Sequence, residues 1–269
     1  MNSSPSPDQI IEALRFFEED RPFPREHVLA AIAQREAMTP LLLAELESMG
    51  RNPEAVQDHE ALHLYAMYLL SYFREPLALP LFIRFFSFPG EAALDATGDL
   101  VAEDLGRMLA SVCAGNTASI EAFIEDEAVH EAVRAAALDA FVVLVAAGLM
   151  PRAAVVEFFR ALFSSRLHRE PSGVWAGLLM ACVDLHPGDW MPELRRAFKE
   201  GLFTDLAYSL DEVEACARLD RDAVLLDLRE EWRLIGDPVE EMSWWACFPQ
   251  DGGGQSDEAP DFSAERTRP

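Results

Sequence analysis

Apolar residues recur along the chain at the three- and four-residue spacing of amphipathic helices. The runs LHLYAMYLLSYF at 62–73 and EAVRAAALDAFVVLVAAG at 131–148 are the most apolar of the expected helices. Such spacing places apolar side chains on one helical face, because a helix makes one turn in 3.6 residues. No segment alternates β-branched and polar residues as a half-buried strand does. The pattern predicts an all-α protein of about 12–14 helices, each of roughly 10–18 residues.

Proline and glycine mark the expected ends of these helices. Proline is tolerated in the first helical turn, where its missing N–H would be unpaired anyway. In the pair Thr39-Pro40, the threonine is the predicted N-cap and the proline the first helical residue. Gly50 and Gly148 fall where apolar runs end, as glycines that terminate helices do.

Successive predicted helices form pairs. The helix at 62–73 is followed by EPLALPLFIRFFSFPG, and the helix at 131–148 by MPRAAVVEFFRALFSSRL. Small residues allow two helices to approach closely, while larger ones fill the space between pairs. The second pair begins with a pattern that resembles a HEAT-type repeat, which consists of Val133, Arg134, Ala136, Ala137, Ala140 and Leu144. We therefore expect an α-solenoid of stacked antiparallel pairs; a compact helical bundle is the alternative.

The composition changes at both ends of the chain. Residues 249–269 read PQDGGGQSDEAPDFSAERTRP, in which Phe262 is the only large apolar residue. Such a segment buries too little surface to offset the entropy lost on ordering. The expected organisation is a flexible N-terminus at 1–7, a helical repeat domain at 8–248 and a disordered acidic, glycine-rich tail at 249–269.

The formal charge of −25 limits the kinds of partner. Nucleic acids and anionic membranes are bound by clustered Lys and Arg, which release counterions. HEAT-like nucleic-acid-binding proteins, such as certain DNA-repair glycosylases, are therefore a disfavoured alternative. An acidic surface attracts a basic protein partner or simply keeps the chain soluble. We expect a protein partner, and neither a nucleic acid nor a membrane.

Cysteine usage and the apolar runs indicate a cytoplasmic protein. Cys113, Cys182, Cys216 and Cys247 are far apart, and no CxxC pair is present. Isolated cysteines in apolar surroundings are typical of free thiols in a reducing compartment. The apolar stretch at 140–150 is shorter than the roughly 20 residues that span a bilayer. The first residues, MNSSPSPDQIIEAL, lack the pattern of a signal peptide.

The segment HEALH at 59–63 matches a zinc motif. On a helix, His59 and His63 would share one face, and Glu60 would be the base that activates a zinc-bound water. Zinc also needs a third protein ligand, for which Glu91, Glu103 and Asp104 are possible. No motif surrounds these acids, so a zinc hydrolase is the less favoured alternative. The preferred interpretation places both histidines at an exposed helix start, with no metal, no cofactor and no catalytic residue.

Acidic residues repeat in the segment LDATGDLVAEDLGR at 94–107. Asp95, Asp99 and Glu103 recur every four residues, and Asp104 is adjacent. On one continuous helix they would form a stripe of repelling charges, which a break at Gly98 would interrupt. A divalent cation needs more converging oxygen ligands than this spacing demonstrates. We interpret Asp99, Glu103 and Asp104 as part of a solvated face or of a partner surface.

The pair Trp244-Trp245 lies near the end of the predicted domain. Adjacent helical residues point about 100° apart, so the two rings lie on different faces. One ring is expected to pack on the last repeat and cap the solenoid. The other ring is expected to contribute to the partner surface.

Four segments together resemble a bacterial family known as domain of unknown function 1186. They are FPREHVLAAIAQREAMTPLLLAELE (23–47), LYAMYLLSYFREPLALPLFIRFFSFPGE (64–91), GDLVAEDLGRMLASVCAG (98–115) and VEEMSWWACF (239–248). The resemblance implies a HEAT-like helical protein of the bacterial cytoplasm without an assigned activity. Some relatives continue into a cysteine-rich SEC-C zinc module, whereas residues 249–269 contain no Cys or His.

The expected function is a non-catalytic scaffold or adaptor that binds proteins through a concave, acidic surface.

Overall fold

The fold is all-α. The computed structural model describes residues 4–17, 22–56, 60–204, 207–245 and Phe248. Within these ranges the chain forms sixteen α-helices and three short η helices, without a strand beyond two isolated β-bridges. The predicted all-α solenoid class is confirmed, but the helices are more numerous than the expected 12–14, because breaks such as the one at Gly98 divide the apolar runs into shorter helices. The predicted tail at 249–269 lies outside the described residues, as do residues 1–3 of the predicted flexible N-terminus.

The helices follow one another with short connections. The first third contains α1 (Pro7–Leu14), α2 (Arg25–Ala33), α3 (Arg35–Met49), η1 (Pro53–Ala55), α4 (Leu62–Phe73) and α5 (Ala78–Phe86). The middle contains α6 (Ala92–Thr97), α7 (Leu100–Glu103), α8 (Leu105–Val112), α9 (Thr117–Glu125), α10 (Glu131–Ala146), α11 (Arg152–Ala161) and η2 (Leu162–Arg166). The last third contains α12 (Gly173–Asp184), η3 (Pro187–Trp190), α13 (Met191–Glu200), α14 (Leu210–Cys216), α15 (Arg221–Glu231) and α16 (Pro238–Met242).

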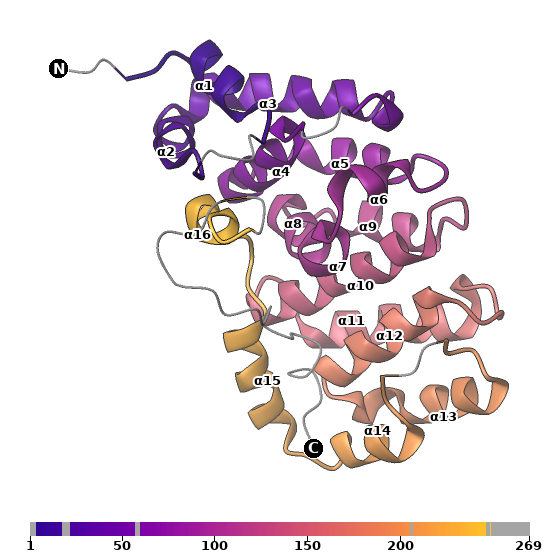
Figure 1. Ribbon diagram of the computed structural model, residues 1–269. Coiled ribbons are helices and arrows are strands. Elements are labelled where there is room, and N and C mark those ends of the chain that lie inside the picture. The colour runs from indigo at the N-terminus through magenta and orange to yellow at the C-terminus, as the bar shows by residue number, and fades with distance from the viewer. Residues whose placement is uncertain (1–3, 18–21, 57–59, 205–206, 246–247, 249–269) are drawn as a thin grey trace, which may run out of the picture.

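The helices stack into a solenoid. In one row α3 packs on α4, α4 on α8, α8 on α10, and α10 on α12. Outside this row α5 packs on α9. Figure 1 shows the stack running from α1–α3 at one end to α13 and α14 at the other. One continuous apolar core extends through the stack, because adjacent helices bury their apolar sides against one another.

The closest helix contacts are those of α10 with α8 and α12. A Cβ on Gly106 of α8 would lie 2.5 Å from the Cβ of Asp139 and 2.9 Å from the carbonyl oxygen of Ala136. A Cβ on Gly177 of α12 would lie 2.8 Å from the Cβ of Ala135. Alanine and glycine thus set the spacing of the row, as the small residues of the repeat-like pattern predict.

Replacing Gly106 or Gly177 by alanine is expected to destabilise the protein by about 1–3 kcal/mol, the usual cost of overpacking. The added methyl group would force α10 away from its neighbour, and this outweighs the better helix propensity of alanine. Urea unfolding followed by circular dichroism measures the change. Gly173→Ala is the control, because its Cβ would meet its nearest atom at an ordinary 3.5 Å. Equal stability of all three variants would contradict this packing.

One expected helix boundary is wrong. Pro40 lies inside α3, which begins at Arg35, and the Thr39 hydroxyl donates to the Arg35 carbonyl oxygen at 2.8 Å instead of capping a helix. The first helix, α1, begins at Pro7, next to the expected start of the helical domain at residue 8. Ser6 caps α1 in a reciprocal capping box with Gln9, which fixes that start.

The end of the chain returns along the stack. We call residues 221–245, which include α15 and α16, the C-terminal arm. Its first helix, α15, packs on α10 and α12, and α16 packs on α2 and α4. Figure 1 shows the arm in tan and yellow along one side of the stack, with α16 beside the N-terminal helices. The arm therefore connects the last repeats to the first ones.

Candidate functional site

The C-terminal arm is attached to the stack by backbone hydrogen bonds. The Arg74 guanidinium donates to the Ile235 carbonyl oxygen at 2.8 Å, and the Ile235 N–H donates to the Ser111 hydroxyl at 3.0 Å. The side chains of Ile235, Val239 and Met242 are buried. Polar bonds thus hold the extended part of the arm in register, and apolar burial holds α16.

Arg107 of α8 is the centre of a charged cluster under the arm. Its guanidinium forms ion pairs with Asp104 and with Glu241 of α16, the latter at 2.6 Å. It also donates to the carbonyl oxygens of Arg233 at 3.0 Å and Leu234 at 3.4 Å. One side chain therefore joins α7–α8 to both the extended part and the helix of the arm.

Burial and charge shape the ionisation of this cluster. Burial opposes the charge of Arg107, but the hydrogen bonds and attraction of Glu241 and Asp104 more than offset it and raise its pKa. The Tyr68 hydroxyl donates to Asp104. Burial, and then the Asp104 charge, raise the pKa of Tyr68 above its ordinary value. The prediction that Asp104 belongs to an open surface is wrong, because its carboxylate faces this buried cluster.

The acidic stripe is interrupted. Gly98 has a φ of +55° and ends α6, so Asp95 lies within α6 whereas Asp99 precedes α7 as its N-cap residue. Asp99 and Glu103 are exposed, whereas Asp104 is buried. The break at Gly98 is as the sequence suggested. A role of Asp99 and Glu103 in partner binding stays a prediction.

A groove of about 480 Å³ lies where the arm meets α7 and α8. We call it the acidic groove, after five glutamates that line it: Glu103, Glu230, Glu231, Glu240 and Glu241. Glu241 is paired with Arg107. Among the described residues, Glu230, Glu231 and Glu240 have no ion-pair partner. Arg233 is the other basic residue of the lining besides Arg107, so the groove carries a net negative charge from its five glutamates, and its lining contains no nucleophile with an adjacent base.

The two tryptophans behave differently. Trp245 lies 5.4 Å from the Tyr68 ring and 6.2 Å from the Phe17 ring, both measured between centroids. Trp244 is 55% exposed. One ring packs and the other faces outward, as predicted, but the packed ring contacts the N-terminal end rather than the last repeat. The expected cap on the last repeat is wrong because the arm returns. Partner binding by either ring stays a prediction.

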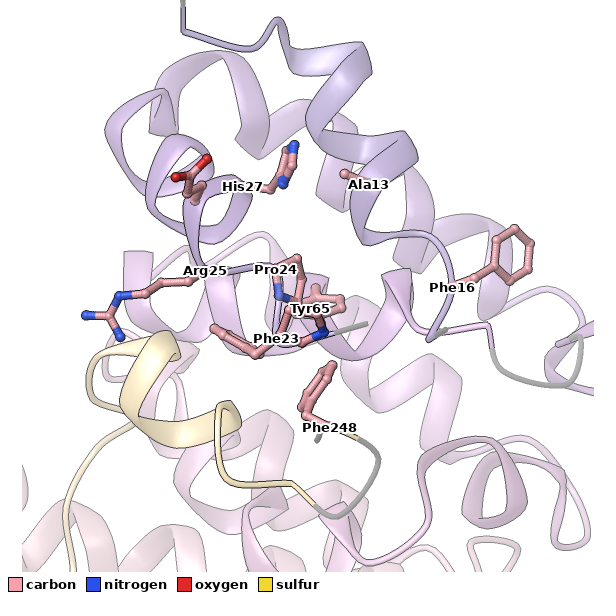
Figure 2. Close-up of a pocket in the computed structure, with 10 residues that line it drawn as sticks. Ala13, Phe16, Phe23, Pro24, Arg25, His27, Tyr65 and Phe248 are labelled. Atoms are coloured by element: carbon pink, nitrogen blue, oxygen red, sulfur yellow. The ribbon is translucent and has the colours of Figure 1, made fainter. Parts of the chain in front are cut away.

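An aromatic pocket of about 290 Å³ lies at the N-terminal end of the stack. Figure 2 shows Phe23, Tyr65 and Phe248 close together. The Phe248 ring meets the Phe23 ring edge-on at 5.2 Å. Arg25 and His27 of α2 also line the pocket. This lining suits an apolar group, and the end of the described chain forms one wall.

The HEALH segment does not form an exposed helix start. His59 lies outside the described residues, and Glu60 precedes α4 in an isolated bridge with Phe16. His63 is fully buried, and its Nε2 lies 2.8 Å from the Ala96 carbonyl oxygen. The expected exposure of His63 is wrong. In the described part of the chain, no three His, Cys, Asp or Glu side chains are placed to hold a metal ion.

Burial lowers the pKa of His63, although its bond to Ala96 and the charge of Glu60 oppose the shift. The folded protein therefore takes up this proton less readily than the unfolded chain, whose histidine titrates near about 6.5. The stability from neutral His63 is present above that pH and is lost as the pH falls below it, by up to about 1.4 kcal/mol per pH unit.

His63→Gln keeps a donor for the Ala96 carbonyl but cannot titrate. Between about pH 8 and pH 5, its free energy of unfolding is expected to fall less than that of the wild type. Urea unfolding at a series of pH values measures this difference. Parallel pH profiles of the two proteins would contradict the burial of a neutral imidazole.

The stacked helices define a helical-repeat protein of the α-solenoid class, with an acidic groove beside its returning end. The chain belongs to the family described as protein of unknown function (DUF1186), whose model matches residues 7–249. An uncharacterized protein of Chlamydia trachomatis is 36% identical over 225 residues, which cover 82% of this chain and 89% of the relative. An uncharacterized protein of Chlamydia muridarum is also 36% identical, over 82% and 90% of the two chains. No solved structure shows significant similarity.

Sequence reasoning missed the main residues of the site. Arg107 stands in the acidic segment as an ordinary basic residue, and Glu230, Glu231 and Glu240 are distant from it in the chain. The acid-rich strings REEWR at 229–233 and VEEM at 239–242 were the available signal. These two segments lie beside α7 and α8 only because the arm returns along the stack.

Proposed function

We propose that the protein is a non-catalytic adaptor that binds a basic segment of a protein partner in the acidic groove. The observation that supports it is the set of glutamates Glu230, Glu231 and Glu240, which face one groove without ion-pair partners among the described residues. Carboxylates that lack a counterion attract Lys and Arg, and complementary charge speeds association and selects the partner.

The arm changes where such a partner would bind. Because the arm covers part of the row of α4, α8, α10 and α12, the proposed surface is the border between arm and stack rather than an open concave face. Asp99, Glu103 and Trp244 are exposed and extend the surface that we propose. No helix in the described ranges has the length and apolar content to cross a membrane. We propose that the adaptor acts in the cytoplasm.

A fluorescent peptide with alternating basic and small polar residues tests the proposal by anisotropy. Binding is expected to weaken with added salt and to fall about fivefold in Glu230→Gln/Glu240→Gln, which removes two groove charges. Glu36→Gln/Glu127→Gln is the matched control, because it removes the same charge from exposed positions outside the groove. Equal loss in both double variants would show that only net charge matters and would reject the groove.

A further inference from the structure

A second pocket lies next to the acidic groove, against α15 at the start of the arm. It has a volume of about 200 Å³ and is lined by α12, α14 and α15 together with Tyr208 and Trp232. Glu231 and Trp232 line both the pocket and the groove. The two hollows are therefore adjacent, so a partner segment in the groove could place one side chain in the pocket.

The pocket combines apolar, aromatic and acidic side chains. Val183 and Leu228 contribute apolar lining, and the rings of Tyr208 and Trp232 contribute aromatic faces. Its volume lies below the range of about 300–1,000 Å³ of pockets for drug-sized ligands. The pocket is thus suited to one long side chain, with an apolar wall for the stem and polar groups for its end.

The polar groups of the pocket include three carboxylates. Asp184, Asp227 and Glu231 line it, and neither Asp227 nor Glu231 has an ion pair with a described residue. The ionisation of Tyr208 reflects the same arrangement: burial raises the pKa of its hydroxyl, and the charge of Asp184 is the next cause. A cation in the pocket would therefore meet complementary charge.

Hydrogen bonds fix the turn beneath the pocket. Arg152 donates to the carbonyl oxygens of Leu185 at 2.6 Å and His186 at 2.7 Å. The His186 Nε2 lies 3.2 Å from the Leu219 carbonyl oxygen. Burial raises the pKa of the Cys216 thiol, which keeps it protonated at neutral pH. These groups hold the shape of the pocket and supply no activated nucleophile.

We propose that the pocket accepts an arginine side chain of the basic partner segment. The proposal rests on the proposed function and specifies the residue that anchors the segment. The arginine stem packs on Val183 and Leu228, and the guanidinium lies against an aromatic ring and pairs with Asp227 and Glu231. Arginine fits better than lysine, because a planar guanidinium both stacks on aromatic rings and pairs with carboxylates in a fork.

Two peptides of equal length and charge test the proposal, one with arginine and one with lysine at every basic position. The wild-type protein is expected to bind the arginine peptide about threefold more tightly. Two variants act on the pocket alone. Asp227→Asn removes one carboxylate. Val224 also lines the pocket, so Val224→Trp fills it without a change of charge. Both are expected to bring the affinity ratio of the two peptides close to one, with unchanged circular dichroism.

The groove variant Glu230→Gln/Glu240→Gln separates this proposal from the proposed function. It is expected to weaken both peptides equally and to preserve the preference for arginine. An arginine preference that survives in both pocket variants would overturn the pocket but leave the groove. An unaffected affinity in the groove variant would overturn the proposed function, and failure of both peptides to bind the wild type would overturn both.

Discussion

Arg107→Met is expected to destabilise the protein by about 2–4 kcal/mol, less than the roughly 3–5 kcal/mol of a fully buried pair because the Arg107 side chain is 21% exposed. The variant leaves the carboxylates of Asp104 and Glu241 facing each other under the arm without a counterion, and it removes two bonds to arm carbonyls. Urea unfolding measures the loss. Because natural domains are stable by about 5–15 kcal/mol, a change of this size is a large part of the total.

Arg195→Met is the matched control. Arg195 forms one ion pair with Glu214 at 2.8 Å, and its side chain is 55% exposed. Exposed pairs contribute about 0–1 kcal/mol. If both methionine variants lost the same stability, the Arg107 cluster would not hold the arm. Adding Asp104→Asn and Glu241→Gln to Arg107→Met is expected to restore part of the loss, since it removes the unpaired buried charges.

Truncation within the arm is expected to have a still larger effect. A chain that ends at residue 237 lacks Val239, Met242 and Phe248, all of which are buried. Each contributes about 1.5–3 kcal/mol by burial, so the expected loss is about 5 kcal/mol or more. Calorimetry should show a lower melting temperature and a smaller unfolding enthalpy.

A chain that ends at Phe248 is the control for this truncation. Its melting temperature is expected to stay close to that of the full chain, because the removed segment is polar and rich in glycine. Similar melting temperatures of the full chain and both truncated chains would contradict the stabilising contacts of the arm. A large loss already in the control would show that residues 249–269 contribute to the folded domain.

The solenoid could be predicted because its signals are local. Helical periodicity, small residues in a close-packed helix and short connections are all visible in the sequence. The boundary at Pro40 failed because proline disfavours but does not forbid a helix interior, and Thr39 bonds back to Arg35 within α3. The return of the arm could not be predicted, since it depends on contacts between residues as distant as Arg74 and Ile235.

The candidate site was only partly predictable. His63 lies in LHLYAMYLLSYF, which has no polar face. A helix that is apolar all round is buried, so the sequence itself argued against an exposed histidine. In the sequence Asp104 looks like the acidic residues around it, which are exposed. Its burial follows from its ion pair with Arg107 and its hydrogen bond from Tyr68, which the sequence does not show. Spacing along the chain shows which residues share a helix, but not which helix end meets the arm.

The return of the arm also affects how the chain acquires its structure. An open repeat array can fold from its first repeat onward as the ribosome releases it, because each repeat contacts only its neighbours. Here the hydrogen-bond partners of Arg74 and Arg107 in the arm lie 161 and 134 residues later in the sequence. Closing such long loops costs entropy and slows folding. The first helices therefore reach their final state only after residues 235–241 have been synthesised, and we expect contacts between the two ends of the stack to couple their unfolding.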